Sequence, residues 1–186
     1  VMSLPAPRSV GVASVDERLL LSLETPMAPE DMLTALNAQA VAGIEFTAAR
    51  EVVKGQCNVP SAMAYELTLD ADETASVAAA LETLLATEQW LVERAMKSKR
   101  NKRRAPEVKR TKQLDLRPRV RHIGLDGHTL RFTLQPIDGS WARLGEIAVS
   151  LGMDKADAVG RILRTHIEDE FPTGASALGD THIPST

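Results

Sequence analysis

The sequence predicts an α+β protein with a ferredoxin-like βαββαβ unit, followed by a β-hairpin and a C-terminal helical pair. Two observations support this fold class. Over residues 16–96, segments with the period-two pattern of strands and segments with the apolar stripe of helices follow the order of two split βαβ units. From residue 113 onward there is an alternating stretch, then an Asp-Gly turn and two short helical stripes.

The first half of the ferredoxin-like unit comprises a strand, a helix and a second strand. Residues 16–24 contain a leucine run, which is typical of a strand buried on both faces. Pro29 suits the first turn of the following helix, because proline lacks the N–H that this turn leaves unpaired. The second strand is expected over residues 44–53, after Gly43. The apolar stripe of the helix consists of Met32, Leu33, Leu36 and Ala40.

The second half of the unit has a similar order. Residues 63–69 alternate like a half-buried strand, and residues 90–96 also have the composition of a strand. Between them we expect a helix that starts at a cap formed by Asp70 or Asp72 and runs to Thr87. The stripe of this helix consists of Val77, Leu81, Leu84 and Leu85.

Residues 113–121 alternate between two kinds of side chain, as expected for an extended segment with one buried face. Pro118 cannot donate a ladder hydrogen bond, so this segment is expected to be an edge strand or to precede one. Asp126-Gly127 then predicts the turn of a β-hairpin. The inner face holds Leu114, Leu116, Pro118 and Val120, and the exposed face holds Asp115, Arg117, Arg119 and Arg121.

Two short helices are expected after the hairpin. Gly152 suits the residue that ends the first helix, and Asp154 suits the N-cap of the second. The residues from Pro172 onward are small and polar, and we expect them to be disordered. The helical stripes are Trp141, Leu144, Ile147, Ala148 and Leu151 in the first helix and Val159, Ile162 and Leu163 in the second. The predicted domains are the α+β domain 1–96, a basic loop 97–112, residues 113–171 and a tail over 172–186.

A basic stretch interrupts an otherwise acidic chain. Residues 97–122 hold twelve Lys and Arg against two acids, which leaves ten basic and 23 acidic residues elsewhere in a chain of net charge −3. Two interpretations stay open: a solvated loop, or a phosphate-binding arm whose cations displace counterions from a nucleic acid. The candidate nucleic-acid-binding residues are Lys97, Lys99, Arg100, Lys102, Arg103, Arg104, Lys109, Arg110, Lys112, Arg117, Arg119 and Arg121.

The composition of this stretch favours recognition of phosphates or of nucleic-acid shape. It lacks the aromatic side chains on which single-strand binders stack bases. Alternate residues of a strand are about 6.6 Å apart, so the three arginines of the extended segment would match the spacing of backbone phosphates. No amphipathic helix accompanies the stretch, and no apolar run is long enough for a membrane span, so we expect no membrane partner.

A second nucleic-acid interpretation is a helix-turn-helix around Gly152, with Arg161 and Arg164 exposed on its second helix. An ordinary helical hairpin has the same pattern, because two helices joined at a glycine are common. The sequence alone leaves both open.

No catalytic motif is apparent in the sequence. It has neither a phosphate-binding loop GxxxxGK[ST] nor a dinucleotide fingerprint, and no nucleophile is paired with a base. Cys57 is the one cysteine, and the four histidines, at positions 122, 128, 166 and 182, lack the spacing of metal ligands. We therefore expect a non-enzymatic protein without catalytic residues, metal or cofactor. A single cysteine fits a reducing compartment, and we expect the cytoplasm.

Three segments occur in an informative order: LPAPRSVGVASVDE, LSLETPMAPEDMLTALNAQAVAGIEFTAAREV and KRTKQLDLRPRV. Together they resemble the radical SAM-linked proteins, a bacterial family encoded beside, or fused behind, a radical S-adenosylmethionine enzyme. The resemblance covers residues 3–170. The residues that match the motifs of this family are Pro5, Gly11, Ser14, Glu17, Leu36, Asn37, Asp115, Leu116, Arg117 and Pro118.

The chain departs from this family at its front. Members usually begin with an "LSHLD"-like and a "GFNPRP"-like segment, and neither occurs in this sequence. We therefore expect that the N-terminal segment of the family is missing here, and that the first sheet lacks a strand.

The resemblance implies a companion role. A radical SAM enzyme holds its [4Fe–4S] cluster with three cysteines, and this chain has one, so the radical chemistry is expected in a partner enzyme. Members also occur near genes for RNA processing, in agreement with the basic stretch. We expect a non-catalytic accessory domain that binds RNA or presents a substrate to a radical SAM enzyme. The alternatives are an adaptor that docks this enzyme and a helix-turn-helix protein.

Overall fold

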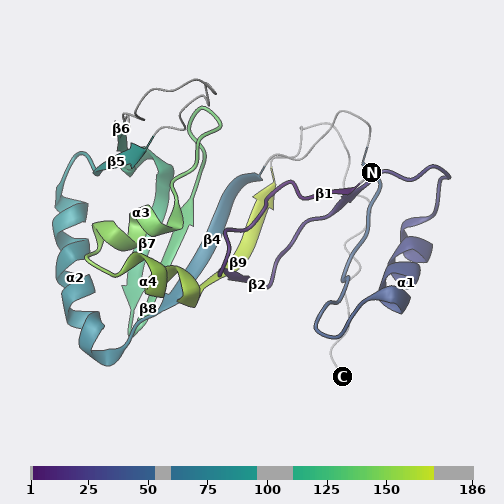
Figure 1. Ribbon diagram of the computed structural model, residues 1–186, viewed down its shortest axis with the longest axis horizontal. Coiled ribbons are helices and arrows are strands. Elements are labelled where there is room, and N and C mark those ends of the chain that lie inside the picture. The colour runs from purple at the N-terminus through teal and green to yellow at the C-terminus, as the bar shows by residue number, and fades with distance from the viewer. Residues whose placement is uncertain (1, 53–59, 96–110, 170–186) are drawn as a thin grey trace, which may run out of the picture. The chain divides into compact units, whose positions relative to one another are not determined.

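The structure, a computed structural model, describes residues 2–52, 60–95 and 111–169 (Figure 1). The chain divides into two compact units. The described part of unit 1 comprises residues 2–7, 18–52 and 169, and that of unit 2 comprises residues 8–17, 60–95 and 111–168. Both helices and sheets are present, so the predicted α+β class is confirmed.

Unit 1 contains one helix and a small sheet. The helix, α1, runs over Pro29–Gln39 with Pro29 in its first turn, as predicted. The expected strand over residues 16–24 is reduced to β3 (Leu20–Leu21), which pairs antiparallel with β1 (Met2–Ser3). Both strands have two residues, so little of this segment contributes to a sheet.

The strand predicted over residues 44–53 was wrong where the structure describes it, since residues 44–52 contain no strand. The Asn37 side chain binds the backbone here instead. Its Nδ2 donates to the Phe46 carbonyl at 2.8 Å, and its Oδ1 accepts from the Phe46 N–H at 2.9 Å. This side chain therefore occupies the donor and the acceptor that Phe46 would offer to a neighbouring strand.

Unit 2 is built on a five-stranded sheet with the order β2-β9-β4-β8-β7. Its strands differ from those of the expected βαββαβ unit, because β4 alone among these five comes from residues 16–96. The predicted hairpin is confirmed: β7 and β8 are antiparallel, Asp126 pairs with Thr129, and the two turn residues are Gly127 and His128. The strands are β2 (Ala13–Ser14), β4 (Pro60–Thr68), β7 (Val120–Asp126), β8 (Thr129–Leu134) and β9 (Ile162–Asp169).

The core of unit 2 follows from the period-two pattern. Met63, Tyr65 and Leu67 of β4 are buried, and so are the residues opposite them on β8. Tyr65 and Phe132 stack with ring centroids 5.4 Å apart. Helix α2 (Ala71–Ala86) begins after Asp70, whose N–H donates to Glu73 at 3.0 Å, which confirms the choice of Asp70 as cap.

A second sheet of unit 2 pairs β5 (Leu91–Ala95) with β6 (Thr111–Asp115), antiparallel, with Ala95 opposite Thr111. The strand predicted over residues 90–96 is confirmed for its described part. After β6 the chain forms a 3₁₀ turn, η1 (Arg117–Arg119), before β7. The predicted continuous extended segment is therefore interrupted at this turn.

The turn explains which predictions of burial are correct. Leu116 is 0% exposed and Val120 is buried, as predicted. Two predictions were wrong, because the 3₁₀ turn breaks the alternation of a strand: Pro118, expected on the inner face, is exposed, and Arg119, expected on the exposed face, is 8% exposed. Its guanidinium donates to the carbonyls of Asp115 at 2.9 Å and Ser140 at 3.2 Å.

The prediction of a helical pair was correct for the turn between the two helices and wrong for the apolar stripe of the second helix. Helices α3 (Leu144–Ser150) and α4 (Lys155–Arg161) are joined by Gly152 at φ +77°, and Asp154 accepts two backbone N–H groups as N-cap. Ile162 and Leu163 lie in β9 rather than in the helix. Arg164, predicted to be exposed, is 1% exposed within this strand.

We expect Leu116→Ala to lower the free energy of unfolding by about 2–5 kcal/mol, because the substitution leaves a cavity in a fully buried site. Leu91→Ala is the matched control, since Leu91 lies on β5 with 54% of its surface exposed and should change stability by less than about 0.5 kcal/mol. Urea denaturation measures both. Equal effects of the two substitutions would contradict the assignment of Leu116 to the core.

Candidate nucleic-acid interface

The twelve candidate basic residues fall into two groups. Four of them, Lys112, Arg117, Arg119 and Arg121, are described by the structure. The other eight lie between Ala95 and Thr111 and outside the described residues: Lys97, Lys99, Arg100, Lys102, Arg103, Arg104, Lys109 and Arg110. We call residues 96–110 the basic connection, because they join β5 to β6. Their attachment points are the paired residues Ala95 and Thr111.

The four described candidates have different surroundings. Lys112 is exposed on β6, opposite Arg94 in the register. Arg121 is exposed and forms an ion pair of 2.8 Å with Glu168. Arg119 is buried against backbone carbonyls and cannot reach a phosphate. Of these four, Lys112 and Arg117 keep a positive charge at the surface without such a partner.

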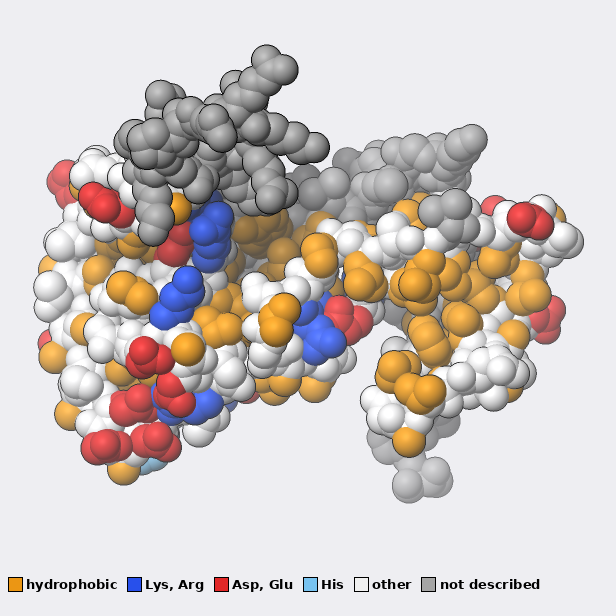
Figure 2. Space-filling model, viewed as in Figure 1, with side chains coloured by type: hydrophobic (Ala, Val, Ile, Leu, Met, Phe, Trp, Pro, Cys, Tyr) orange, Lys and Arg blue, Asp and Glu red, His pale blue; other side chains and the backbone are white. Residues whose placement is uncertain are grey.

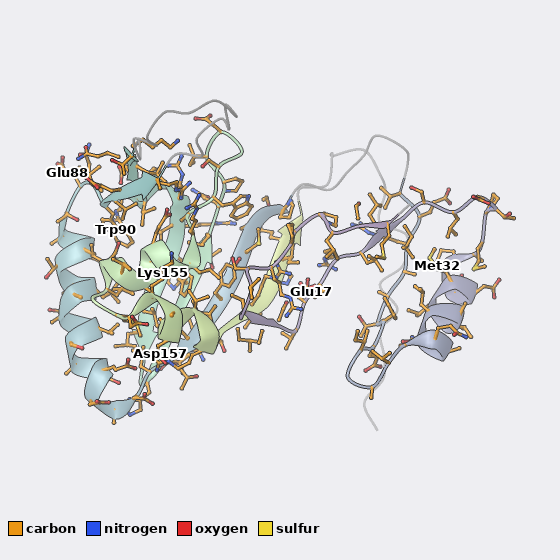
Figure 3. The ribbon with its side chains drawn as sticks, viewed as in Figure 1. Glu17, Met32, Glu88, Trp90, Lys155 and Asp157 are labelled. Atoms are coloured by element: carbon orange, nitrogen blue, oxygen red, sulfur yellow. The ribbon has the colours of Figure 1, made fainter. Side chains whose placement is uncertain are left out.

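Arg117 lies over the ring of Trp90, with its guanidinium carbon 5.5 Å from the ring centroid. Trp90 is buried, so its ring packs against Arg117 and is not available to stack on a base. Figure 3 shows Trp90 in unit 2 beside the end of α2. The interaction restricts the Arg117 side chain, which lowers the entropy lost when it binds an anion.

The family-motif residues Asp115, Leu116 and Pro118 form the corner between β6 and β7 in which Arg117 lies. The Asp115 carboxylate accepts the N–H of Trp90 at 2.8 Å and the N–H of Arg117 at 2.9 Å. The Leu116 N–H donates to the Trp90 carbonyl at 2.8 Å, and the Pro118 carbonyl accepts from Gln135. Three of the four residues of this motif are therefore structural, and Arg117 is the one that presents a charge.

A buried ion pair connects this corner to α3. Arg94, on β5 next to the basic connection, donates to Glu146 at 2.7 Å and to the Trp141 carbonyl at 3.0 Å. Arg94 and Glu146 are 9% and 13% exposed in their side chains. Arg119 donates to the Ser140 carbonyl of the same segment. The two buried arginines thus attach residues 140–146 to both β5 and η1.

The charge of Glu146 is maintained by its neighbours. Burial acts to raise the pKa of Glu146, but the hydrogen bonds from the Arg94 guanidinium and the Arg143 N–H outweigh it, and the net pKa is lowered. Glu146 is therefore ionised at neutral pH. This pair was not predicted from the sequence. The signal for it was the position of Arg94 on the same face of β5 as Val92, because a charged side chain on a buried face needs a partner.

Two further family-motif residues, Ser14 and Glu17, bind Arg164. The Ser14 hydroxyl accepts from Arg164 Nε at 3.3 Å, and the Glu17 carboxylate accepts from its Nη2. Arg8 binds the same carboxylate at 2.6 Å. Gly11 has φ +91°, a conformation that glycine adopts without strain. Ser14 and Glu17 are thus explained by the burial of a charged residue that the sequence had placed at the surface; Pro5 lies half-buried in unit 1.

Tyr65 lies beside this network. Burial raises the pKa of the Tyr65 hydroxyl above its usual value, although the charge of Arg164 opposes the effect. The hydroxyl donates to the Met63 sulfur at 3.2 Å. Tyr65 therefore stays neutral and belongs to the core.

Among the described residues, no group of three or more His, Cys, Asp or Glu side chains is placed to hold a metal ion. His128 Nδ1 lies 2.7 Å from the Thr74 hydroxyl, and His166 Nδ1 lies 3.2 Å from Asp16. Cys57 and His182 lie outside the described residues. Within the same ranges, no helix combines the length and the apolar character that crossing a membrane requires.

Comparison with known proteins yields one match. A family model described as "Uncharacterized protein conserved in bacteria (DUF2344)" matches residues 1–143. No curated protein and no solved structure matches the chain. The matched range contains both groups of motif residues and the whole basic connection, and it ends at the residue before α3.

We expect Glu146→Gln to lower the free energy of unfolding by about 3–5 kcal/mol at pH 7, because it leaves Arg94 buried without a countercharge. Since the folded state lowers the pKa of Glu146, the difference from wild type should be complete above the ordinary pKa of glutamate, about 4.3, and should shrink as the pH falls below it.

Urea titrations between pH 7 and pH 3 measure this difference. Glu66→Gln is the control, because Glu66 pairs with Arg131 at the surface, where solvent screens an ion pair and leaves it little effect on stability. A difference between wild type and Glu146→Gln that grows on acidification would contradict the assignment.

Proposed function

We propose that this chain, which belongs to the bacterial family DUF2344, is a non-catalytic cytoplasmic accessory protein that binds RNA and presents it to a radical SAM enzyme. The observation that carries the proposal is the position of the basic connection between two paired strands, one of which is held by the buried ion pair of Arg94 and Glu146. A charged segment attached in this way is fixed at both ends to the core of unit 2.

The distribution of charge supports a local contact with a polyanion. The basic connection holds eight Lys and Arg and a single acid, Glu107, whereas the chain as a whole has a net charge of −3. Most arginines that the structure describes in unit 2 are already paired with carboxylates: Arg8, Arg94, Arg121, Arg131, Arg161 and Arg164. RNA attraction is therefore expected from the basic connection and its immediate surroundings, since the acidic remainder repels it.

The partner enzyme in this proposal follows from the resemblance to radical SAM-linked proteins. One cysteine cannot supply the three thiolates that such an iron–sulfur cluster needs. The chemistry is therefore assigned to the partner, and the role of this chain is to bind and position. RNA as the presented substrate agrees with the charge of the basic connection.

A second candidate function, an adaptor that docks the radical SAM enzyme, is favoured by the apolar surface of unit 1. No residue of α1 is buried. Its first turn carries two acids, Glu30 and Asp31, so a complementary partner surface combines apolar and basic side chains. Figure 2 shows hydrophobic side chains on this unit. The exposed large apolar residues here are Met2, Leu4, Leu23, Met27, Val41 and Ile44.

We expect the chain to bind RNA with a steep dependence on salt. If about five phosphates are contacted, the slope of log K against log salt is about −3.5 for a single strand and −4.5 for a duplex. Replacing Lys99, Arg100, Lys102, Arg103 and Arg104 with Ser should flatten this slope. Fluorescence anisotropy at several salt concentrations, with transfer RNA and a DNA duplex of matched length, measures it.

The urea midpoint of the five-serine variant serves as its control for folding. Equal, weak binding by the wild type and the variant would reject RNA binding and favour the adaptor. Tighter binding of the DNA duplex than of RNA would instead favour duplex recognition near α3 and α4.

The adaptor predicts co-purification of an iron–sulfur protein from native cells, and loss of this protein with Val41→Glu and Ile44→Glu. Both residues are more than half exposed, so the charges should leave unit 1 folded. Val149→Glu is the matched control, because Val149 is equally exposed on α3 of unit 2. Retention of the partner by the unit 1 variant would place the docking surface elsewhere.

A further inference from the structure

We propose that a hollow on the outer face of the five-stranded sheet binds one unpaired base of the RNA. This inference rests on the proposed RNA binding and deepens it, because base contacts add selectivity to a protein whose basic residues are expected to bind phosphates. The outer face carries the side chains of β4 and β8 that alternate with the buried ones and point away from the core. The hollow is lined on this face by Ala64, Glu66, His122, Arg131, Thr133 and Thr165.

The register of the strands brings these residues together. His122 of β7 is opposite Thr133 of β8, and Thr133 is opposite Ala64 of β4. In the next row of the same face, Gly124 is opposite Arg131. The two smallest residues of these rows, Ala64 and Gly124, leave space between longer side chains. A glycine inside a strand often marks a position that a ligand approaches closely, because it forgoes the packing that a side chain would provide.

The His122 ring lies beside Gly124. A Cβ atom built on Gly124 would lie 3.6 Å from His122 Nε2 and 3.9 Å from its Cε1, so a side chain at this position would occupy the space next to the ring. The φ of Gly124 is not positive, so its backbone does not require glycine. His122 is exposed, and its ring is therefore available to stack on a base, as histidine rings do in proteins that bind single-stranded RNA.

The polar groups around the hollow are available to a ligand. Among the residues that the structure describes, none forms a hydrogen bond with the imidazole of His122 or with the hydroxyl of Thr133 or Thr165. Both threonines are half-buried at the hollow. A hydroxyl can donate one hydrogen bond and accept others, and an imidazole can do both. These groups therefore match the mixture of donors and acceptors on the edge of a base.

The charge and the size of the hollow favour a base over a phosphate. Arg131 Nε donates to Glu66 at 2.9 Å, and Arg131 Nη1 donates to Asp126. Two carboxylates outnumber this one guanidinium, so the local charge does not attract an anion. The volume of the hollow, about 190 Å³, is smaller than the about 300–1,000 Å³ of pockets that hold drug-sized ligands. It suits a single neutral ring system that keeps one side in solvent.

The test is His122→Ala in the full chain, measured by fluorescence anisotropy with a single-stranded RNA of mixed sequence and with an abasic strand of the same length. Loss of one stacked base should weaken RNA binding about 5- to 150-fold. The salt slope should not change, because a base contact releases no counterion. The abasic strand should bind the variant and the wild type equally. His128→Ala is the matched control, since His128 is exposed in the hairpin turn and does not line the hollow.

Two further variants separate the binding of a base from the stability of the fold. His122→Phe keeps an aromatic ring and should retain most of the RNA affinity. Gly124→Ala places a methyl group in the hollow and should weaken RNA binding. Its urea midpoint should be unchanged or higher, because alanine restricts the unfolded chain more than glycine does.

Four results would reject the inference, and one of them would also reject the proposed function. If the wild type binds RNA and His122→Ala behaves as His128→Ala does, the inference fails and the proposed function stands. Equal weakening of the RNA and the abasic strand would show that His122 acts on the backbone instead. Displacement of the RNA by an equal concentration of nucleoside monophosphates would assign the hollow to a free nucleotide. If the wild type shows no salt-dependent RNA binding, both are rejected.

Discussion

The buried ion pair between Arg94 and Glu146 is the interaction on which the arrangement of unit 2 depends most. Arg94 sits at the end of β5, and Glu146 lies in the first turn of α3, so one contact joins the small sheet to the helical pair. A buried charge is costly without its partner. The fold therefore cannot move the start of α3 away from β5 without exposing or orphaning one of these charges.

This constraint separates two uses of arginine in one chain. Arg94, Arg119 and Arg164 are buried, and they hold segments together by binding carbonyls and carboxylates. Arg117 is instead placed over Trp90, and its N–H donates to the Asp115 carboxylate. In the proposed function Arg117 contacts RNA, and the position of its backbone depends on the 3₁₀ turn that Arg119 holds.

Local patterns predicted the elements whose signals lie within one segment. Pro29, Asp70, Asp126-Gly127 and Asp154 each mark a helix start or a turn through their own backbone chemistry, and each prediction was confirmed. The failures depend on distant partners. Ile162 and Arg164 continue the helical pattern of α4, yet pairing with β2 and the buried contact to Glu17 place them in β9. For the candidate site, the sequence located the basic charges but could not show which of them are buried, because Arg119 turns inward at a 3₁₀ turn.

Ultraviolet crosslinking of the full chain to RNA, followed by cleavage after glutamate and mass spectrometry, tests the central claim most directly. Cleavage at Glu93, Glu107, Glu146 and Glu168 separates the peptides of interest. The account predicts crosslinks in the peptides that begin after Glu93 and Glu107, which carry the basic connection, Lys112 and Arg117. Crosslinks confined to unit 1, or to the peptide that precedes Glu93, would contradict it.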